Sequence, residues 1–200
     1  GLTVFQKLLL QFIVAIVFYI LFRHFTEGES VLRVTLLGLD WNLGWFYGVF
    51  ILLLLVGTSN AVNLTDGLDG LASSTTMCYT MGMVAIMFAC IASRMDGVSS
   101  IYLMEYKNLI VLGFVVIGAM ICFLVFNCLT AKIFMGDTGS LSLGAVMGAI
   151  AILTHREVTL LVVAFVFVIE TLSVILQVIW VYVFKRKLFL MTPLHHHFEK

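Results

Sequence analysis

The sequence predicts an all-α polytopic membrane protein with about six transmembrane helices. Hydrophobic residues make up 62% of the 200 residues and charged residues only 11%, whereas soluble domains carry about 25% charged residues. The apolar residues gather in long runs, and a helix needs roughly 20 mostly apolar residues to cross a bilayer. Basic and acidic residues balance at 11 each. This balance argues against nucleic acid as a partner, and the apolar composition indicates the lipid bilayer instead.

Six apolar runs are long enough to cross the membrane, and we expect them to form a single integral membrane domain. They are 5–22, 46–62, 71–93, 108–127, 139–154 and 158–184. The fifth run carries Gly144 and Gly148 in a spacing that favours close helix packing. The sixth run is long enough to tilt or break. Between the first two runs, residues 31–44 contain β-branched residues around Gly38, a pattern that favours a short external β-hairpin.

The order of the spans places three polar stretches on one side of the membrane. Each crossing changes sides, so the ends of the second, fourth and sixth spans share a face. These ends carry NLTDGLDG (63–70), AKIFMGDTGS (131–140) and KRKLFLMTPLHHHFEK (185–200). The basic run Lys185–Lys187 directly follows a span, and the positive-inside rule therefore predicts that this face is cytoplasmic.

Two aspartates, Asp66 and Asp69, lie three residues apart at the end of the second span. Each aspartate would cost about 2.5–3.5 kcal/mol at mid-bilayer, so we expect both at the interface or in a wet cavity. With Asn60 and Asn63 they recur every third residue, which makes one polar stripe on a helix. A helix cap at Asp66 or Asp69 is the plainer alternative, but it does not explain the two asparagines.

Asp137 follows Gly136 where the fifth span begins. It is either a helix cap or part of a site shared with Asp66. Carboxylates with few cations nearby suit Mg²⁺, which takes one or two carboxylates and completes its shell with water and substrate phosphates. A metal-bound diphosphate is therefore the ligand that this face favours.

Three histidines and one acid within a span complete the candidate residues. His195, His196 and His197 are adjacent, so their side chains point in different directions, and phosphate hydrogen bonding or acid–base work suits them better than one shared metal. Glu170 lies inside the sixth span, where an ionisable residue indicates function. An ion-coupled transporter also carries polar stripes and intramembrane acids, and a structural subunit without activity is a further alternative.

Four stretches resemble the phospho-N-acetylmuramoyl-pentapeptide transferase family, a branch of the polyprenyl-phosphate N-acetylhexosamine-1-phosphate transferase superfamily. They are GTSNAVNLTDGLDGLA, FMGDTGSLSLGAVMGAIAIL, FVIETLSVILQV and PLHHHFEK. The resemblance implies Mg²⁺-dependent transfer of phospho-N-acetylmuramoyl-pentapeptide from UDP-N-acetylmuramoyl-pentapeptide to undecaprenyl phosphate, giving lipid I and UMP for peptidoglycan synthesis. It implies a multi-pass protein of the bacterial inner membrane with a cytoplasmic site, and a homodimer is its expected assembly. The related N-acetylglucosamine-1-phosphate transferases stay the alternative enzyme, although the ending PLHHHFE favours the first branch.

The resemblance also implies roles for individual residues. It gives catalytic roles to Asp66, Asp137, His195, His196 and His197, with Asp137 as the Mg²⁺ ligand. It gives substrate binding to Asn63, Asp69, Asn127, Phe134 and Gly136, with Phe134 stacked on uracil. The family carries a D-D-x-x-K motif and further helices beyond the matching region, so we expect this chain to be part of a longer protein and to make no lipid I alone.

Overall fold

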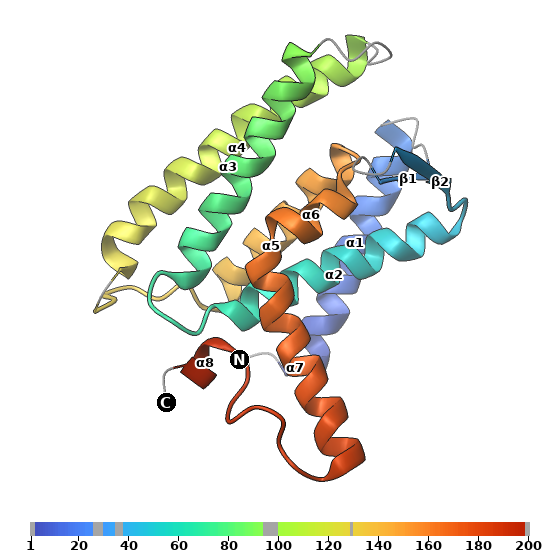
Figure 1. Ribbon diagram of the computed structural model, residues 1–200. Coiled ribbons are helices and arrows are strands. Elements are labelled where there is room, and N and C mark those ends of the chain that lie inside the picture. The colour runs from blue at the N-terminus through green and yellow to red at the C-terminus, as the bar shows by residue number, and fades with distance from the viewer. Residues whose placement is uncertain (1–2, 26–29, 35–37, 94–99, 129, 199–200) are drawn as a thin grey trace.

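The computed structural model describes residues 3–25, 30–34, 38–93, 100–128 and 130–198, which form helices and one small sheet (Figure 1). The helices are α1 (Val4–Phe25), α2 (Phe46–Thr65), α3 (Leu71–Ala92), α4 (Ser100–Asn127), α5 (Gly136–Leu153), α6 (Glu157–Val163), α7 (Phe165–Phe184) and α8 (His195–Phe198). Within the described residues, six helices are long and apolar enough to cross a membrane. The predicted fold class, an all-α polytopic membrane protein, is confirmed.

The helix bounds differ from the expected spans in two places. The sixth expected span is divided at Ala164, whose φ of −95° and ψ of 26° leave the helical region between α6 and α7. The fourth helix begins at Ser100, well before the expected start at residue 108. Glu105 and Lys107 lie in its first two turns, so these turns are helical but more polar than the apolar run that follows them.

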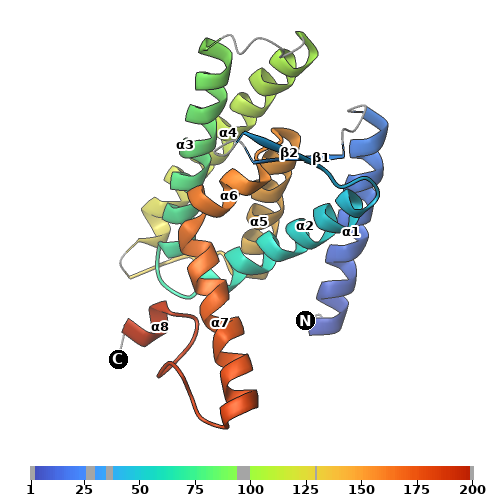
Figure 2. The same cartoon turned by 45° about the vertical axis from the view of Figure 1, so that its right-hand side comes forward.

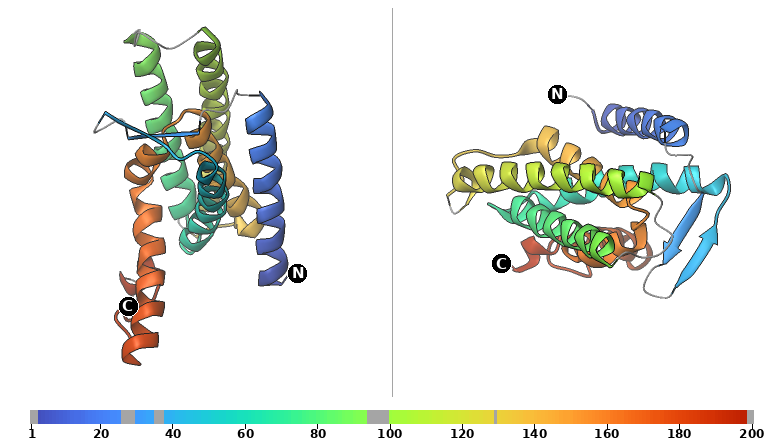
Figure 3. Two further views of the ribbon diagram at one scale, coloured as in Figure 1. Left: turned by 90° about the vertical axis from the view of Figure 1, so that its right-hand side faces the viewer. Right: turned by 90° about the horizontal axis from the view of Figure 1, so that it is seen from above.

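The expected hairpin is present between α1 and α2. Strand β1 (Val31–Val34) pairs antiparallel with β2 (Leu39–Asn42), with Val31 opposite Asn42 and Val34 opposite Leu39. Gly38 has a φ of 62°, a left-handed conformation that glycine adopts without steric cost. The hairpin lies across one end of the helices, where β1 packs against α6 (Figure 3, right).

A buried polar pair lies behind this hairpin. The hydroxyl group of Tyr47 in α2 donates a hydrogen bond to the carboxylate of Glu157 at the start of α6. Tyr47 and Glu157 are 0% and 1% exposed. Burial raises the pKa of Glu157, and the hydrogen bond from Tyr47 and the charge of Arg33 oppose that rise.

Helix α5 packs on α2 with almost no space between the two backbones. A Cβ atom added to Gly144 would lie 2.4 Å from the carbonyl oxygen of Thr58 and 2.5 Å from the Cα of Ser59. Glycine at this position therefore permits an approach that any side chain would block, as the small-residue spacing predicted. The core between α2, α3, α5, α6 and α7 is built from buried apolar side chains: Val62, Tyr79, Met83, Met147, Ile150, Ala151, Leu160, Ala164 and Phe167.

The chain crossings bring several helix ends to one side of the protein. Helices α3 and α4 form an antiparallel pair on one flank, and α1 lies on the other flank (Figure 2). Helices α2, α4 and α7 end, and α5 begins, at the lower side in Figure 1. After α7 the chain turns back and places α8 beside the turn that joins α2 to α3.

Candidate functional site

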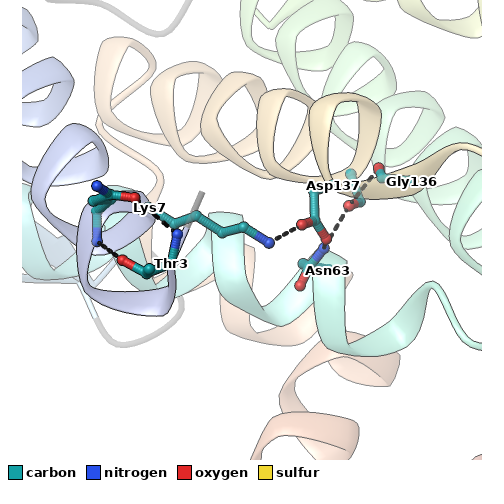
Figure 4. A network of polar contacts seen from close by, with 7 residues as sticks. Thr3, Lys7, Asn63, Gly136 and Asp137 are labelled. Atoms are coloured by element: carbon teal, nitrogen blue, oxygen red, sulfur yellow. Dashed lines mark hydrogen bonds and ion pairs between the residues drawn. The ribbon is translucent and has the colours of Figure 1, made fainter. Parts of the chain in front are cut away.

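Asp137 is the centre of a polar network that joins three helices (Figure 4). The ammonium group of Lys7 in α1 donates to the Asp137 carboxylate. The Nδ2 atom of Asn63 in α2 donates to Asp137 Oδ1 at 2.9 Å and to Ser140 Oγ at 2.8 Å. The side chain of Asp137 is still 49% exposed. Its carboxylate is therefore oriented by neighbours and yet open to a ligand.

Asp66 lies beside the same network, at the residue that ends α2. Its backbone N–H donates to the carbonyl groups of Val62 and Asn63, which closes the last turn of the helix. Burial raises the pKa of the Asp66 carboxyl above its usual range. A hydrogen bond from the backbone of Gly136 opposes that rise, and the negative charge of Asp137 adds to it. Asp66 and Asp137 thus flank the first residue of α5.

Asn127 holds two loops together beneath this network. Its Oδ1 atom accepts hydrogen bonds from the backbone N–H of Gly70 at 3.0 Å and from Ser73 Oγ at 3.1 Å. Its Nδ2 atom donates to the carbonyl oxygen of Ile133 at 2.9 Å. Asn127 is only 4% exposed. The observed contacts of Asn127 are therefore with the protein, and they shape the loop that ends at Asp137.

Two further predicted residues, Asp69 and Phe134, are exposed on these loops. Asp69 is exposed, and its Oδ2 atom accepts a hydrogen bond from the backbone N–H of Ala131 at 3.0 Å. Phe134 is 74% exposed, so its ring contributes little to the protein interior. An exposed aromatic ring three residues before an oriented carboxylate is suited to stack on a planar ligand.

His195 reaches the Asp66 turn from the other end of the chain. A Cβ atom added to Gly67 would lie 2.3 Å from His195 Nε2, so the imidazole rests directly on that glycine. The carboxylate of Glu170 in α7 accepts hydrogen bonds from the His195 backbone N–H at 3.2 and 3.3 Å. Glu170 Oε2 also lies 3.2 Å from His195 Nδ1, a close contact that is not aligned as a hydrogen bond. Both side chains are buried.

The other two histidines point elsewhere, as expected for adjacent residues. The ring of His196 lies 4.2 Å, centre to centre, from the ring of His195. His197 Nδ1 accepts a hydrogen bond from the backbone N–H of Leu190 at 3.2 Å. Among the described residues, no three histidine, cysteine or acidic side chains gather closely enough to hold a metal ion by themselves.

The structure brings together most of the predicted site residues and adds others that the sequence did not single out. Lys7 is separated from Asp137 by 130 residues. The feature of the sequence that could have indicated a role for Lys7 is the presence of a cation in a mostly apolar segment. Glu170 was singled out without a partner, and His195 is that partner. The expected polar stripe is divided: Asn60 faces Gln11 of α1, with Asn60 Nδ2 donating to Gln11 Oε1 at 2.7 Å.

Comparison with known proteins agrees with the motifs. A phospho-N-acetylmuramoyl-pentapeptide-transferase of Listeria monocytogenes is 46% identical to this chain over 203 residues, and one of Bacillus subtilis is 47% identical over 199 residues. Each alignment covers 100% of this chain and 57% of the relative, so the chain spans little more than half the length of these relatives. The family model described as glycosyl transferase family 4 matches residues 1–155. The chain therefore belongs to glycosyl transferase family 4.

Proposed function

We propose that this chain carries the carboxylate, nucleotide and histidine parts of an enzyme that makes lipid I. The enzyme transfers phospho-N-acetylmuramoyl-pentapeptide from its UDP-linked donor to undecaprenyl phosphate and releases UMP. The observation that carries the proposal is the convergence of Asp66, Asp137 and His195, from distant parts of the chain, on one end of the membrane helices. The named relatives support this substrate assignment over the N-acetylglucosamine branch.

The donor set of the site fits Mg²⁺. Asp137 offers a half-exposed carboxylate at the start of α5, and Asp66 lies on the other side of Gly136. Mg²⁺ uses one or two carboxylates and leaves the remaining positions to water and phosphates, so the lack of a third protein ligand among the described residues is compatible with it. Asp137 would hold the ion, which when bound neutralises diphosphate charge and polarises the bond to UMP.

Lys7 and Asn63 set the direction of the Asp137 carboxylate. Lys7 is 35% exposed and can exchange its contact with Asp137 for a contact with a phosphate oxygen. Phosphoryl transfer depends mainly on positioning and charge neutralisation, and both are tasks for fixed side chains such as these. In this proposal Lys7 and Asn63 align the donor diphosphate without forming a covalent bond to it.

The nucleoside of the donor would lie on the loop that precedes α5. Phe134 presents its ring to solvent, and Asp69 is held nearby through the backbone of Ala131. Stacking of the uracil on Phe134, with Asp69 as a polar contact, accounts for the exposure of both side chains. Asn127 supports this loop through its hydrogen bonds to Gly70 and Ile133.

His195 would act at the diphosphate. Glu170 holds the Nδ1 side of the imidazole, which leaves Nε2 facing the backbone of Gly67, the residue after Asp66. Nε2 is buried and has no hydrogen-bond partner among the described residues, so a phosphate oxygen brought to the Gly67 turn would supply the acceptor that it lacks. Glu170 is in this proposal a positioning residue, because it contacts the histidine and not the substrate.

The location of the site supports the membrane arrangement that we propose. The polar residues gather on the side of the protein toward which α7 runs, and the basic run Lys185–Lys187 that follows α7 favours the cytoplasmic face of a bacterial inner membrane. A transporter would place such groups near the middle of the bilayer. The homodimer that we expect is tested by measuring the mass of the purified protein in detergent.

Substitution of Asp137 by Asn tests the proposed function. In the full-length protein, D137N should keep the fold but lose Mg²⁺-dependent release of UMP and formation of lipid I by at least a hundredfold, since the substitution removes a charged ligand at nearly constant volume. Asp40→Asn is the matched control, because Asp40 lies on the distant strand β2 and is exposed. Near-normal turnover by D137N at ordinary Mg²⁺ concentration would contradict the assignment.

A further inference from the structure

The segment 184–191, here called the basic turn, combines three cations with exposed apolar side chains. Lys185, Arg186 and Lys187 are all exposed, and within the described part of the chain none of them pairs with a carboxylate. Four apolar side chains of the same segment are between 43% and 64% exposed: Phe184, Leu188, Leu190 and Met191. The basic turn directly follows α7, a helix long and apolar enough to span the membrane.

The backbone of the basic turn is held in place by one side chain of α7. Gln177 Oε1 accepts hydrogen bonds from the backbone N–H groups of Leu188 at 3.0 Å and Phe189 at 2.9 Å. Gln177 Nε2 donates to the carbonyl oxygen of Phe189 at 3.2 Å. These three bonds fold the turn back along α7. The exposed side chains are therefore displayed by an ordered backbone at the level where a membrane span ends.

We propose that the basic turn binds anionic phospholipid headgroups in the leaflet on the side of the candidate site. The headgroup phosphates complement the three cations, and the apolar side chains can enter the boundary between headgroups and acyl chains. Each basic residue next to an anionic leaflet strengthens binding about fivefold, so three together favour anionic over zwitterionic lipid by about a hundredfold. Neither the polar network at Asp137 nor the His195 contact uses these three cations.

The basic turn is also linked to the histidine helix. The backbone N–H of Leu190 donates to His197 Nδ1 at 3.2 Å, and the rings of Phe189 and His197 meet edge to face at 6.0 Å. Lipid bound to the turn would restrain α8 and with it the position of His195. This second part rests on the proposed function, and it predicts faster transfer in membranes that contain anionic lipid.

Tryptophan fluorescence tests the lipid contact without any need for turnover. Trp180 lies one turn before the basic turn and is 36% exposed, and replacement of the exposed Trp41 and Trp45 by Phe makes it the single tryptophan. The protein is placed in nanodiscs that contain equal fractions of brominated phosphatidylglycerol or brominated phosphatidylcholine. Brominated phosphatidylglycerol should quench Trp180 at least twofold more strongly. The difference should shrink in 0.5 M sodium chloride, because salt screens charge.

Two variants and one competitor test the lipid contact. The triple variant K185Q/R186Q/K187Q should lose the preference, whereas K107Q, which removes an exposed cation near the start of α4, should keep it. Equal quenching by the two lipids in the single-tryptophan protein overturns the proposal, and so does a preference that survives the triple substitution. If inorganic phosphate abolishes the preference for brominated phosphatidylglycerol and chloride of equal ionic strength does not, the ligand of the basic turn is a free anion and not the lipid.

Turnover of the full-length enzyme tests the link to the histidine helix. We expect transfer to be several-fold faster in phosphatidylglycerol nanodiscs than in phosphatidylcholine nanodiscs, with the difference removed by the triple substitution. If quenching depends on the lipid but the transfer rates are equal in both lipids, the link between the basic turn and the histidine helix is wrong and the lipid contact stands. Absence of transfer in every lipid, with quenching intact, would count against the proposed function alone.

Discussion

One carboxylate, that of Glu170, contacts both the backbone and the ring of His195. Its two oxygens lie 3.2 and 3.3 Å from the His195 backbone nitrogen, and Oε2 lies 3.2 Å from Nδ1. The two side chains are 6% and 7% exposed, so water contributes little to their interaction. Glu170 thus holds the start of α8 through the His195 backbone and lies against the imidazole ring.

Replacement of Glu170 should therefore affect stability and turnover to different degrees. Hydrogen bonds to a charged group contribute about 1.5–3 kcal/mol each, so Glu170→Ala should lower the free energy of unfolding by about 2 kcal/mol. Glu170→Gln keeps an acceptor for the backbone N–H and should unfold nearly as the parent does, but with a lower kcat and an almost unchanged KM. Thermal unfolding and steady-state kinetics measure the two effects. Thr171→Ala is the control, since Thr171 Oγ1 donates to the carbonyl oxygen of Phe167 within α7. A kcat unaffected in E170Q would contradict the positioning role.

Phe134 should contribute to nucleotide binding and not to stability. Its ring is 74% exposed, so Phe134→Ala should leave the melting temperature unchanged within a degree or two. Stacking on a base is worth about 1–3 kcal/mol, and loss of the ring should weaken UMP binding by about tenfold to a hundredfold. Titration calorimetry with UMP measures the affinity, with Ile133→Ala as a neighbouring control. A stable F134A protein that binds UMP normally would exclude the stacking role.

The close approach of α5 to α2 predicts opposite effects for two glycine substitutions. A Cβ atom at Gly144 would meet the backbone of Thr58 and Ser59, whereas a Cβ atom at Gly118 in α4 meets nothing within 4 Å. Overpacking costs about 1–3 kcal/mol, so Gly144→Ala should lower the melting temperature clearly. Gly118→Ala should leave it unchanged or raise it, since alanine favours a helix by about 0.5–1 kcal/mol. Similar melting temperatures for both variants would show that the two backbones are farther apart than described.

Glu157 should make stability depend on pH. Burial raises the pKa of its carboxyl above the ordinary value of 4.5. The folded protein therefore keeps the proton at pH values where the unfolded chain has lost it, and stability falls as pH rises through this window. Glu157→Gln keeps an acceptor for Tyr47 but cannot ionise, so its melting temperature relative to the parent should increase with pH from about 4.5 upward. A melting-temperature difference between E157Q and the parent that stays constant with pH would refute the assignment.

The number of spans and the gathering of the polar stretches on one face were predictable, because both depend on the length and order of the apolar runs and not on individual contacts. An apolar run of sufficient length defines a span, and successive crossings assign its ends to one of two faces. This argument placed Asp66, Asp137 and His195 at the same end of the helices. The hairpin at 31–44 was predictable from local sequence, because its β-branched residues favour strands and Gly38 favours a turn.

Individual side-chain partners were not predictable, because the helices are apolar all round and periodicity does not reveal their buried faces. Lys7 contacts Asp137 through the packing of α1 against α2, which no local pattern encodes. The length of the sixth run allowed for a break, but its position at Ala164 has no proline or glycine to indicate it. The three hydrogen bonds of Gln177 likewise depend on a turn that forms after its own helix has ended.

The parts of the site are synthesised in a fixed order. Lys7 is translated 130 residues before Asp137, and His195 is translated after both. The ribosome delivers the chain from the N-terminus, and helices α1, α2 and α5 are all available to pack before α7 has emerged. The carboxylate half of the site can therefore form in the membrane while the histidine half is still being translated. We expect a chain that ends at residue 155 and has been released from the ribosome to show the Lys7–Asp137 contact in a cysteine cross-linking assay, since the docking of α8 onto Gly67 is a later event.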